Sequence, residues 1–296
     1  MRRLYGPAGR FQTPTPRAPP AFPGYTPGMS RLQTTFRDLH AAGRKTLLPY
    51  VTGGYPDAAT TVEILRQIDP QRCACVEIGI PFSDPIADGP VIQTSFSRAL
   101  EHGFRLDGLF DALRAARDQI AVPLLAMVSY SIVYRRDPRH FVEIAQAAGF
   151  DGLIVPDLAI EEADDLAAIG RERGFPLVMM VAPTTDETRR RRIAAISEPF
   201  IYYQALAGVT GERSALPPDL VQHVQQLRAE TGKPICVGFG IATAAHVQAV
   251  CAVADGAIVG SAIVRRMNES VDRGDSPPAI ARVVAGFIRE LAAALP

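Results

Sequence analysis

The stretch Cys75-Val-Glu-Ile-Gly-Ile-Pro-Phe-Ser-Asp-Pro-Ile-Ala-Asp-Gly-Pro90 passes from a short apolar strand into a loop that carries carboxylates. Glu77 lies inside the apolar run, and Asp84 and Asp88 follow Pro81 in the loop. A charge inside an apolar strand is costly unless it is paired or neutral. The position of Glu77 therefore needs a physical reason, which we sought in the rest of the chain.

Apolar runs of the same kind recur along the chain, and most are followed by a polar or glycine-rich turn and a helical pattern. The runs occupy residues 47–53, 75–80, 123–130, 152–157, 176–183, 200–206, 234–241 and 256–264. Helical patterns occupy residues 58–68, 106–119, 137–148, 160–174, 186–196, 217–231, 244–253 and 278–295. Strands and helices that alternate over about 250 residues are typical of a barrel with eight parallel strands.

The alternative fold is an open, doubly wound sheet. Such sheets usually carry a glycine-rich dinucleotide fingerprint after their first strand. Here the first strand is followed by Thr52-Gly-Gly-Tyr-Pro56, which does not fit that pattern. The sequence thus predicts an α/β fold, a (β/α)8 TIM barrel, preceded by an extra amphipathic helix over residues 31–43.

Composition excludes several classes of protein. The chain has 296 residues, is 47% hydrophobic and has a formal net charge of zero. It has no basic stripe to bind a nucleic acid, and no apolar run reaches the roughly 18 residues of a membrane span. The four cysteines, Cys73, Cys75, Cys236 and Cys251, follow no zinc-binding spacing. We expect buried, reduced thiols in a cytoplasmic protein.

Residues 1–28 differ from the rest of the chain. They are rich in proline and arginine and contain no acid, a composition that predicts a disordered extension. An organellar transit peptide or a mis-assigned start, with Met29 as the true initiator, would each explain it. In either case residues 29–296 are expected to form a single barrel that is the catalytic domain.

Residues at the carboxyl ends of the strands carry the chemistry of such a barrel. Glu77 has the opposite parity to its aliphatic neighbours, so it should point into the barrel interior, where desolvation favours its neutral form. The chain's two lysines, Lys45 and Lys233, precede their strands, and its five histidines fall on expected helices or near their ends. No Schiff-base lysine and no metal site are therefore expected, and acid–base chemistry by carboxylates remains.

Glycines after the last two strands predict a site for a phosphate. Gly238-Phe-Gly240 follows the seventh strand, and Gly260-Ser261 follows the eighth. Barrels often bind phosphate with backbone N–H groups in these two loops. A small phosphorylated substrate would then meet Glu77 across the barrel mouth. Asp88 has a competing interpretation, because a loop aspartate often caps a helix.

Several motifs resemble the tryptophan synthase alpha subunit family. The longest is Val76-Glu-Ile-Gly-Ile-Pro-Phe-Ser-Asp-Pro-Ile-Ala-Asp-Gly-Pro-Val-Ile-Gln93. Others, in the family's order, are Leu48-Pro-Tyr-Val-Thr-Gly-Gly-Tyr-Pro56, Ile154-Val-Pro-Asp157, Gly208-Val-Thr-Gly211, Gly238-Phe-Gly-Ile241 and Gly260-Ser-Ala-Ile-Val264. The resemblance implies a carbon–carbon lyase that cleaves indole-3-glycerol phosphate to indole and glyceraldehyde 3-phosphate in tryptophan biosynthesis.

The resemblance also implies roles for individual residues. Glu77 matches the acid–base glutamate that protonates C3 of the indole ring, and Asp88 matches the aspartate that holds the indole N–H. The remaining matches are to substrate-binding positions. They are Tyr202 beside the glutamate, Thr210 in a lid, Gly211, Gly240, Gly260 and Ser261 at the phosphate, and Tyr50 and Phe239 along the indole slot.

The family works as an α2β2 heterotetramer whose beta subunit carries pyridoxal phosphate, whereas the alpha chain binds no cofactor. Ser131, Ala159 and Ala205 depart from the family pattern, and the first two lie toward the beta subunit. Two alternatives therefore stay open. One is a stand-alone lyase that releases free indole, and the other is a non-catalytic paralogue that activates a beta subunit.

Overall fold

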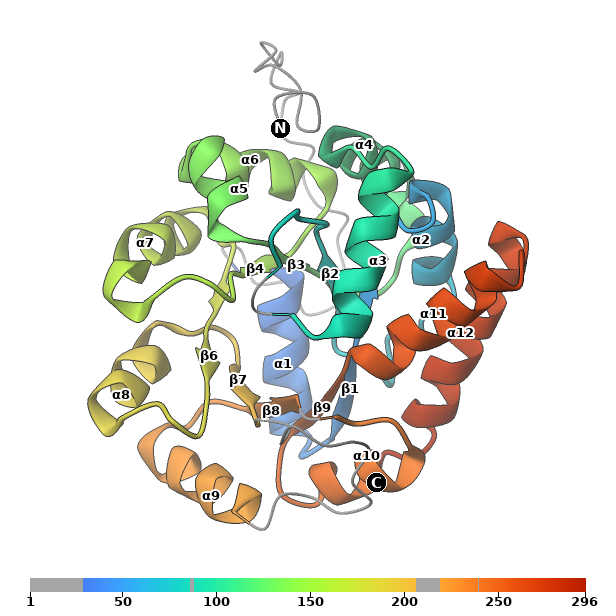
Figure 1. Cartoon of the computed structure of the whole chain (residues 1–296). Helices are drawn as coiled ribbons and strands as arrows, with labels where there is room; N and C mark the ends of the chain where they lie inside the picture. The colour runs from blue at the N-terminus through green and yellow to red at the C-terminus, as the bar shows by residue number, and fades with distance from the viewer. Residues whose placement is uncertain (1–28, 86–87, 206–218, 239) are drawn as a thin grey trace.

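The computed structural model describes residues 29–85, 88–205, 219–238 and 240–296. Its strands form a parallel barrel inside a ring of helices (Figure 1). The strands are β1 (Thr46–Thr52), β2 (Val76–Gly79), β3 (Leu124–Met127), β4 (Gly152–Ile154), β5 (Leu177–Val178), β6 (Met180–Val181), β7 (Ile201–Gln204), β8 (Ile235–Gly238) and β9 (Gly256–Val259). The residues predicted to be disordered, 1–28, lie outside the described part of the chain.

The order of the strands confirms the predicted barrel. Neighbours run β5-β4-β3-β2-β1-β9-β8-β7-β6, and every described pairing is parallel. β5 and β6 are two parts of the single run expected at residues 176–183, separated by Met179. Because β5 pairs with β4 and β6 pairs with β7, this one run closes the ring.

Twelve α-helices are described, with two short 3-10 turns between them. They are α1 (Arg31–Ala41), α2 (Ala58–Arg66), α3 (Pro90–Glu101), α4 (Leu106–Ala116), α5 (Tyr130–Arg135), α6 (Pro138–Ala148), α7 (Ala163–Arg173), α8 (Glu187–Ile196), α9 (Leu220–Glu230), α10 (Ala244–Cys251), α11 (Ser261–Asp272) and α12 (Pro277–Ala292). In the described part of the chain none of them is long and apolar enough to span a bilayer.

The helices α3, α5 and α11 correct the sequence-based prediction. The strand expected to reach residue 264 ends at Val259, and α11 begins at Ser261. The strand expected to reach residue 130 ends at Met127, because Tyr130 begins α5. Short apolar runs do not distinguish a strand from the first turn of a helix that buries the same residues.

Two apolar layers hold the barrel together. Val76, Ile78 and Ile80 point outward and pack with the helices. The inner layer contains Leu32, Phe36, Leu48, Ala74, Cys75, Leu125, Ile154, Val178, Phe200, Tyr202, Cys236 and Ile258. Alternate residues of each strand thus serve opposite faces, as the parity of β2 predicted.

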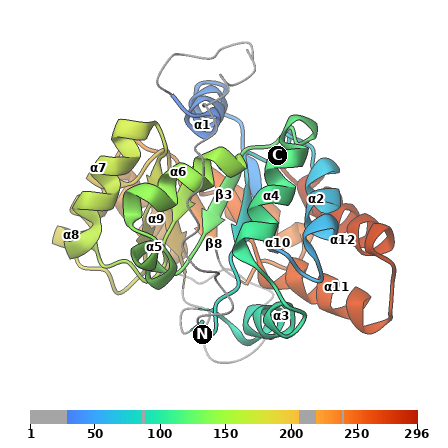
Figure 2. The ribbon, with the colours of Figure 1, turned by 90° about the horizontal axis from the view of Figure 1, so that it is seen from above.

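Helix α1 closes the end of the barrel where the strands begin. It starts with a capping box in which Ser30 and Gln33 each bind the other's backbone N–H. Phe36 then stacks on Phe200 at the start of β7, with 4.6 Å between ring centroids. Figure 2 shows α1 outside the ring at one end of the barrel and α3 toward the other. Chemistry is therefore confined to the end where the strands terminate.

Candidate active site

Glu77 is fully buried in the barrel interior. Its side chain is 0% exposed, and neither carboxyl oxygen has a hydrogen-bond partner among the described residues. On β2 it pairs in register with Tyr50 of β1 and with Leu125 of β3. Burial raises the pKa of Glu77 well above its usual range, which favours the neutral form of the carboxyl group. The buried position agrees with the predicted orientation, and the raised pKa agrees in direction with the predicted neutral form.

Two tyrosines lie in the inner layer with Glu77, and each reaches over a glycine of the next strand. A Cβ atom on Gly79 would lie 1.8 Å from the Tyr50 hydroxyl oxygen, and one on Gly238 would lie 2.7 Å from that of Tyr202. Tyr50 is 2% exposed and Tyr202 is 9% exposed. The two glycines thus leave room for phenol rings at the mouth of the barrel.

Asp88 lies at the mouth, in the loop before α3. The N-cap of α3 is Gly89, and no side chain caps that helix, so the interpretation of Asp88 as a helix cap is wrong. Burial, followed by the charge of Asp157, raises the pKa of the Asp88 carboxyl to about 6. Asp88 is therefore mostly charged at pH 7 and titrates slightly below it.

Asp157 follows β4 and faces the same cleft as Asp88. Its carboxylate accepts hydrogen bonds from the Ser129 hydroxyl at 2.7 Å and from the Tyr130 backbone N–H at 2.8 Å. Asp157 therefore fixes the start of α5. Asp84 is exposed and accepts a hydrogen bond from Ser83, as expected of a turn residue.

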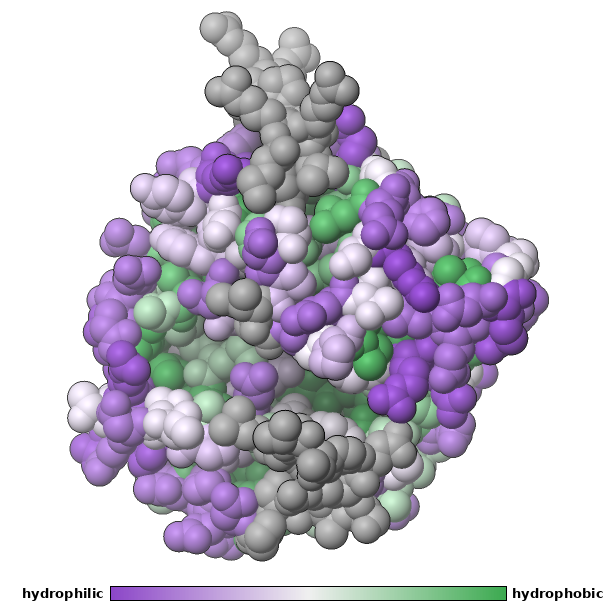
Figure 3. Space-filling model, viewed as in Figure 1, coloured by the Kyte–Doolittle hydropathy of each residue, from purple (hydrophilic) through white to green (hydrophobic). Residues whose placement is uncertain are grey.

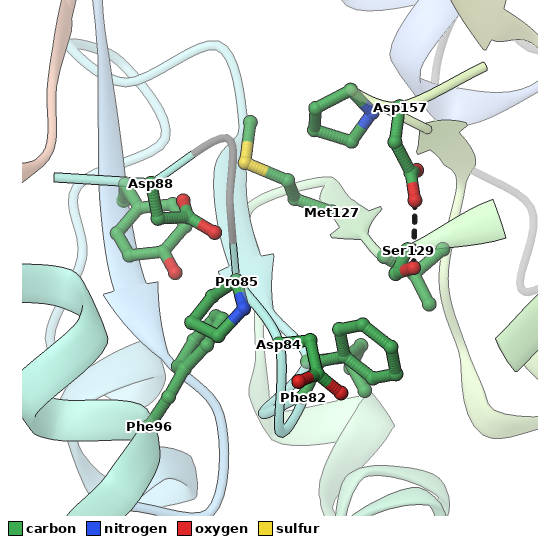
Figure 4. Close-up of a pocket in the computed structure, with 12 residues that line it drawn as sticks. Phe82, Asp84, Pro85, Asp88, Phe96, Met127, Ser129 and Asp157 are labelled. Carbon is green, nitrogen blue, oxygen red and sulfur yellow. Dashed lines mark hydrogen bonds between the residues drawn. The ribbon is translucent and has the colours of Figure 1, made fainter. Parts of the chain in front are cut away.

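A cleft of about 410 Å³, open to solvent, lies between Asp88 and Asp157, and Tyr50 lines it, whereas Glu77 and Tyr202 do not. Figure 3 shows the face hollowed at its centre, with apolar residues at depth and polar residues around the rim. In Figure 4, Asp88 and Asp157 lie on opposite sides of the cleft. The lining residues are Tyr50, Ile80, Phe82, Asp84, Pro85, Asp88, Phe96, Met127, Val128, Ser129, Pro156 and Asp157. Apolar walls that carry the carboxylates of Asp84, Asp88 and Asp157 suit a flat aromatic ligand that has a polar edge.

Several of these lining residues were missed in the sequence. Phe96 comes from α3, the helix that the sequence-based prediction omitted. The dipeptide Gly89-Pro90 was the available signal, because proline is favoured at the first position of a helix. Phe82 and Met127 reach the cleft through the arrangement of two neighbouring loops, which has no local signature.

The predicted phosphate-binding residues are described only in part. Gly240 is exposed with φ of 27°, and Gly260 is the N-cap of α11. Ser261 is exposed, and no side chain caps this helix. Backbone N–H groups at such a helix start are suited to an anion. The predicted residues Thr210, Gly211 and Phe239 lie outside the described residues.

The two lysines lie away from the cleft, as the sequence predicted. Lys45 pairs with Asp255 at 3.1 Å, and Lys233 donates to the carbonyl of Ser197 at 2.7 Å, both where the strands begin. Within the described ranges, no cluster of three or more histidine, cysteine or acidic side chains is arranged to hold a metal ion. The chemistry of this cleft rests on carboxyl groups and phenols. The fold and the site thus define a barrel enzyme of the acid–base class.

Comparison with known proteins identifies the family. The family model for the tryptophan synthase alpha chain matches residues 36–292. The tryptophan synthase alpha chain of Rhodopirellula baltica is 45% identical over 251 residues, which cover 84% of this chain and 90% of that relative. The one from Chloroflexus aurantiacus is 40% identical over 270 residues, with 90% and 99% covered.

Solved structures agree with this family. A tryptophan synthase alpha subunit from Legionella pneumophila has a TM-score of 0.78 at 30% identity, covering 89% of this chain and 98% of that one. A chain from a structure of the tryptophan synthase α2β2 complex of Pyrococcus furiosus has a TM-score of 0.77 at 33% identity, covering 84% and 99%. The chain belongs to the tryptophan synthase alpha chain family, and its reaction is the cleavage of indole-3-glycerol phosphate for tryptophan synthesis.

Proposed function

We propose that Glu77 is the general acid of this lyase and that Asp88 orients the indole ring. The observation that supports this most is the fully buried carboxyl group of Glu77, whose pKa is raised by burial and which has no hydrogen-bond partner among the described residues. A bound substrate would supply the interaction partner that this buried carboxyl group lacks. In this proposal residues 29–296 form one catalytic domain, which works in the cytoplasm without a cofactor.

The proposed steps conserve protons and electrons. Asp88 accepts a hydrogen bond from the ring N–H and favours the indolenine form, while Glu77 gives its proton to C3. The resulting carboxylate then takes the proton of the hydroxyl on the adjacent glycerol carbon as the bond from that carbon to C3 breaks. The bonding electrons return to the ring. Indole and glyceraldehyde 3-phosphate leave, and Glu77 is again protonated.

The other predicted binding residues complete the proposal. Tyr50 borders the indole slot, and Tyr202 stands beside Glu77. Gly240 in the loop after β8, together with Gly260 and Ser261 at the start of α11, holds the phosphate with backbone N–H groups. Thr210, Gly211 and Phe239 are assigned from the family resemblance to the lid, the phosphate site and the indole slot.

We further propose that the chain pairs with a beta subunit that carries pyridoxal phosphate and receives the indole. Structural relatives from an α2β2 complex support this partner. Helix α5 borders the mouth of the cleft and carries the exposed residues Ser131 and Tyr134. Activity that rises strongly when a cognate beta subunit is added favours this reading over a stand-alone lyase.

The decisive test is Glu77→Gln, assayed for indole release from indole-3-glycerol phosphate with and without the beta subunit. The amide keeps the shape of the neutral acid but has no proton to transfer, so we expect a loss of at least about 10² in kcat with an unchanged melting temperature. Glu63→Gln on α2 is the matched control, since Glu63 is far from the cleft and partly exposed. Near-normal turnover of Glu77→Gln would refute the assignment and favour a non-catalytic paralogue.

A further inference from the structure

Tyr50 has a buried hydroxyl group that the proposed roles leave without a function. Its oxygen has no hydrogen-bond partner in the described part of the chain, although the ring is almost fully enclosed. The Thr52 hydroxyl, which is close enough to influence the pKa of Tyr50, is bonded to Ser95, with 2.6 Å between the oxygens. A buried hydroxyl without a partner is unfavourable, so its retention in an apolar interior points to a partner that appears during the reaction.

The barrel places Tyr50 on the strand next to that of Glu77, with its hydroxyl over Gly79. Tyr50 and Glu77 are register partners on adjacent parallel strands, and both point into the barrel. The missing side chain of Gly79 makes the space that the phenol tip occupies. Burial, then the charge of Asp88 and to a smaller extent that of Glu77, raises the pKa of Tyr50 well above its usual range, while the Thr52 side chain lowers it by less. The phenol therefore keeps its proton and stays within electrostatic reach of Glu77.

Proton transfer gives Glu77 a charge that it does not carry in its protonated form. Once Glu77 has given its proton to carbon, it is a carboxylate in an apolar interior. Among the described residues, the titratable groups close enough to sense its charge are Tyr50 on β1, Cys75 just before β2, Tyr202 on β7 and Cys236 on β8. Thiols are weak donors, so the phenols are the only strong donors in this set. Tyr50 is the one on a strand adjacent to Glu77.

We propose that the Tyr50 hydroxyl donates a hydrogen bond to the Glu77 carboxylate formed in the reaction, which makes Tyr50 a positioning residue as well as a wall of the indole slot. This inference rests on the proposed role of Glu77. Hydrogen bonds between a hydroxyl and a carboxylate are short and strong, and they favour the charged form of the acid. The same bond holds the carboxylate in place to take back a proton when the carbon–carbon bond breaks.

Tyr50→Phe tests the proposal, because it removes the hydroxyl and keeps the ring. Loss of a hydrogen bond to a charged group predicts a fall in kcat of about 10- to 100-fold, with KM changed by less than about twofold. The fall in kcat at high pH, where Glu77 loses its proton, should move upward by about one pH unit or more, because the carboxylate has lost a donor. A purely structural role would not move this limb.

A second readout does not depend on turnover. Carbon-13 NMR of the protein with labelled glutamate side-chain carboxyl groups follows the titration of Glu77, whose signal is identified by its absence in Glu77→Gln. We expect Tyr50→Phe to raise the pKa of Glu77. Tyr203→Phe is the matched control, because Tyr203 lies in the outer layer and its hydroxyl is bonded to His223 at 2.8 Å.

Three outcomes would overturn the inference. An unchanged kcat and pH profile in Tyr50→Phe shows that the ring only fills space. A raised KM with an unmoved alkaline limb shows that the hydroxyl contacts substrate instead. A shifted limb in Tyr202→Phe but not in Tyr50→Phe assigns the bond to the other tyrosine. If the wild-type chain is inactive, or Glu77→Gln stays active, the proposed function itself has failed.

Discussion

Gly79→Ala probes the packing that places a tyrosine beside the buried acid. The added Cβ would lie 1.8 Å from the Tyr50 hydroxyl oxygen, 2.4 Å from Cζ and 2.7 Å from Cε2. Three atoms of one rigid ring are too close, and the ring is only 2% exposed. Tyr50 must therefore swing toward the cleft, or β1 and β2 must separate.

The expected cost follows from measurements on overfilled cores. Overpacking a well-packed interior costs about 1–3 kcal/mol of folding free energy. In a domain of this size that lowers the melting temperature by roughly 2–10 °C. Displacement of the ring into the indole slot should also lower kcat/KM by at least about tenfold, since a shift of about 1 Å can cost 10² in rate.

Thermal unfolding and the indole-release assay measure the two effects, and the chain offers two controls. Gly286→Ala in α12 adds a Cβ that meets nothing within 4 Å, so it should stabilise the helix by about 0.5–1 kcal/mol. Gly238→Ala brings its Cβ to 2.7 Å from the Tyr202 hydroxyl, a milder clash that should cost less than Gly79→Ala.

Removal of the ring tip should relieve the clash. In Gly79→Ala/Tyr50→Leu we expect a smaller loss of stability than the sum of the two single changes, because the side chains no longer overlap. A Gly79→Ala protein that melts and turns over like the wild type would refute this account of the site.

Two further predictions concern the charges around the barrel. Asp88 has a pKa of about 6, so its carboxylate is lost as pH falls through 6. KM for indole-3-glycerol phosphate should therefore rise between pH 7 and pH 5 in the wild type. Asp88→Asn should show a large loss of activity, less complete than that of Glu77→Gln, and no rise of KM over this pH range. Asp151→Ala should destabilise the chain by about 3–5 kcal/mol in denaturant titrations while leaving kcat nearly unchanged. The reason is that Asp151 accepts hydrogen bonds from Arg117 at 2.8 Å and from the Leu124 backbone N–H at 2.9 Å, where the strands begin. A stability close to that of the wild type would contradict this prediction.

The resemblance and the local pattern together predicted much of the site. Glu77 was placed inside the barrel because alternation along a strand is a local rule that holds wherever one face meets helices. The competing reading of Asp88 as a helix cap was wrong for a local reason as well, since the N-cap is the next residue, Gly89, and α3 begins at Pro90. The length and position of α3 were missed because its apolar residues follow a loop rich in proline and aspartate.

The sequence by itself determined the barrel, since eight apolar runs separated by helical patterns leave few other ways to bury both faces of a parallel sheet. It also determined which side of β2 carries the acid. Only the tertiary structure decided that the Tyr50 hydroxyl occupies the space above Gly79 and that Asp157 raises the pKa of Asp88. These groups lie on different strands and loops, so their contacts depend on the register of the closed barrel, which periodicity within one segment does not encode.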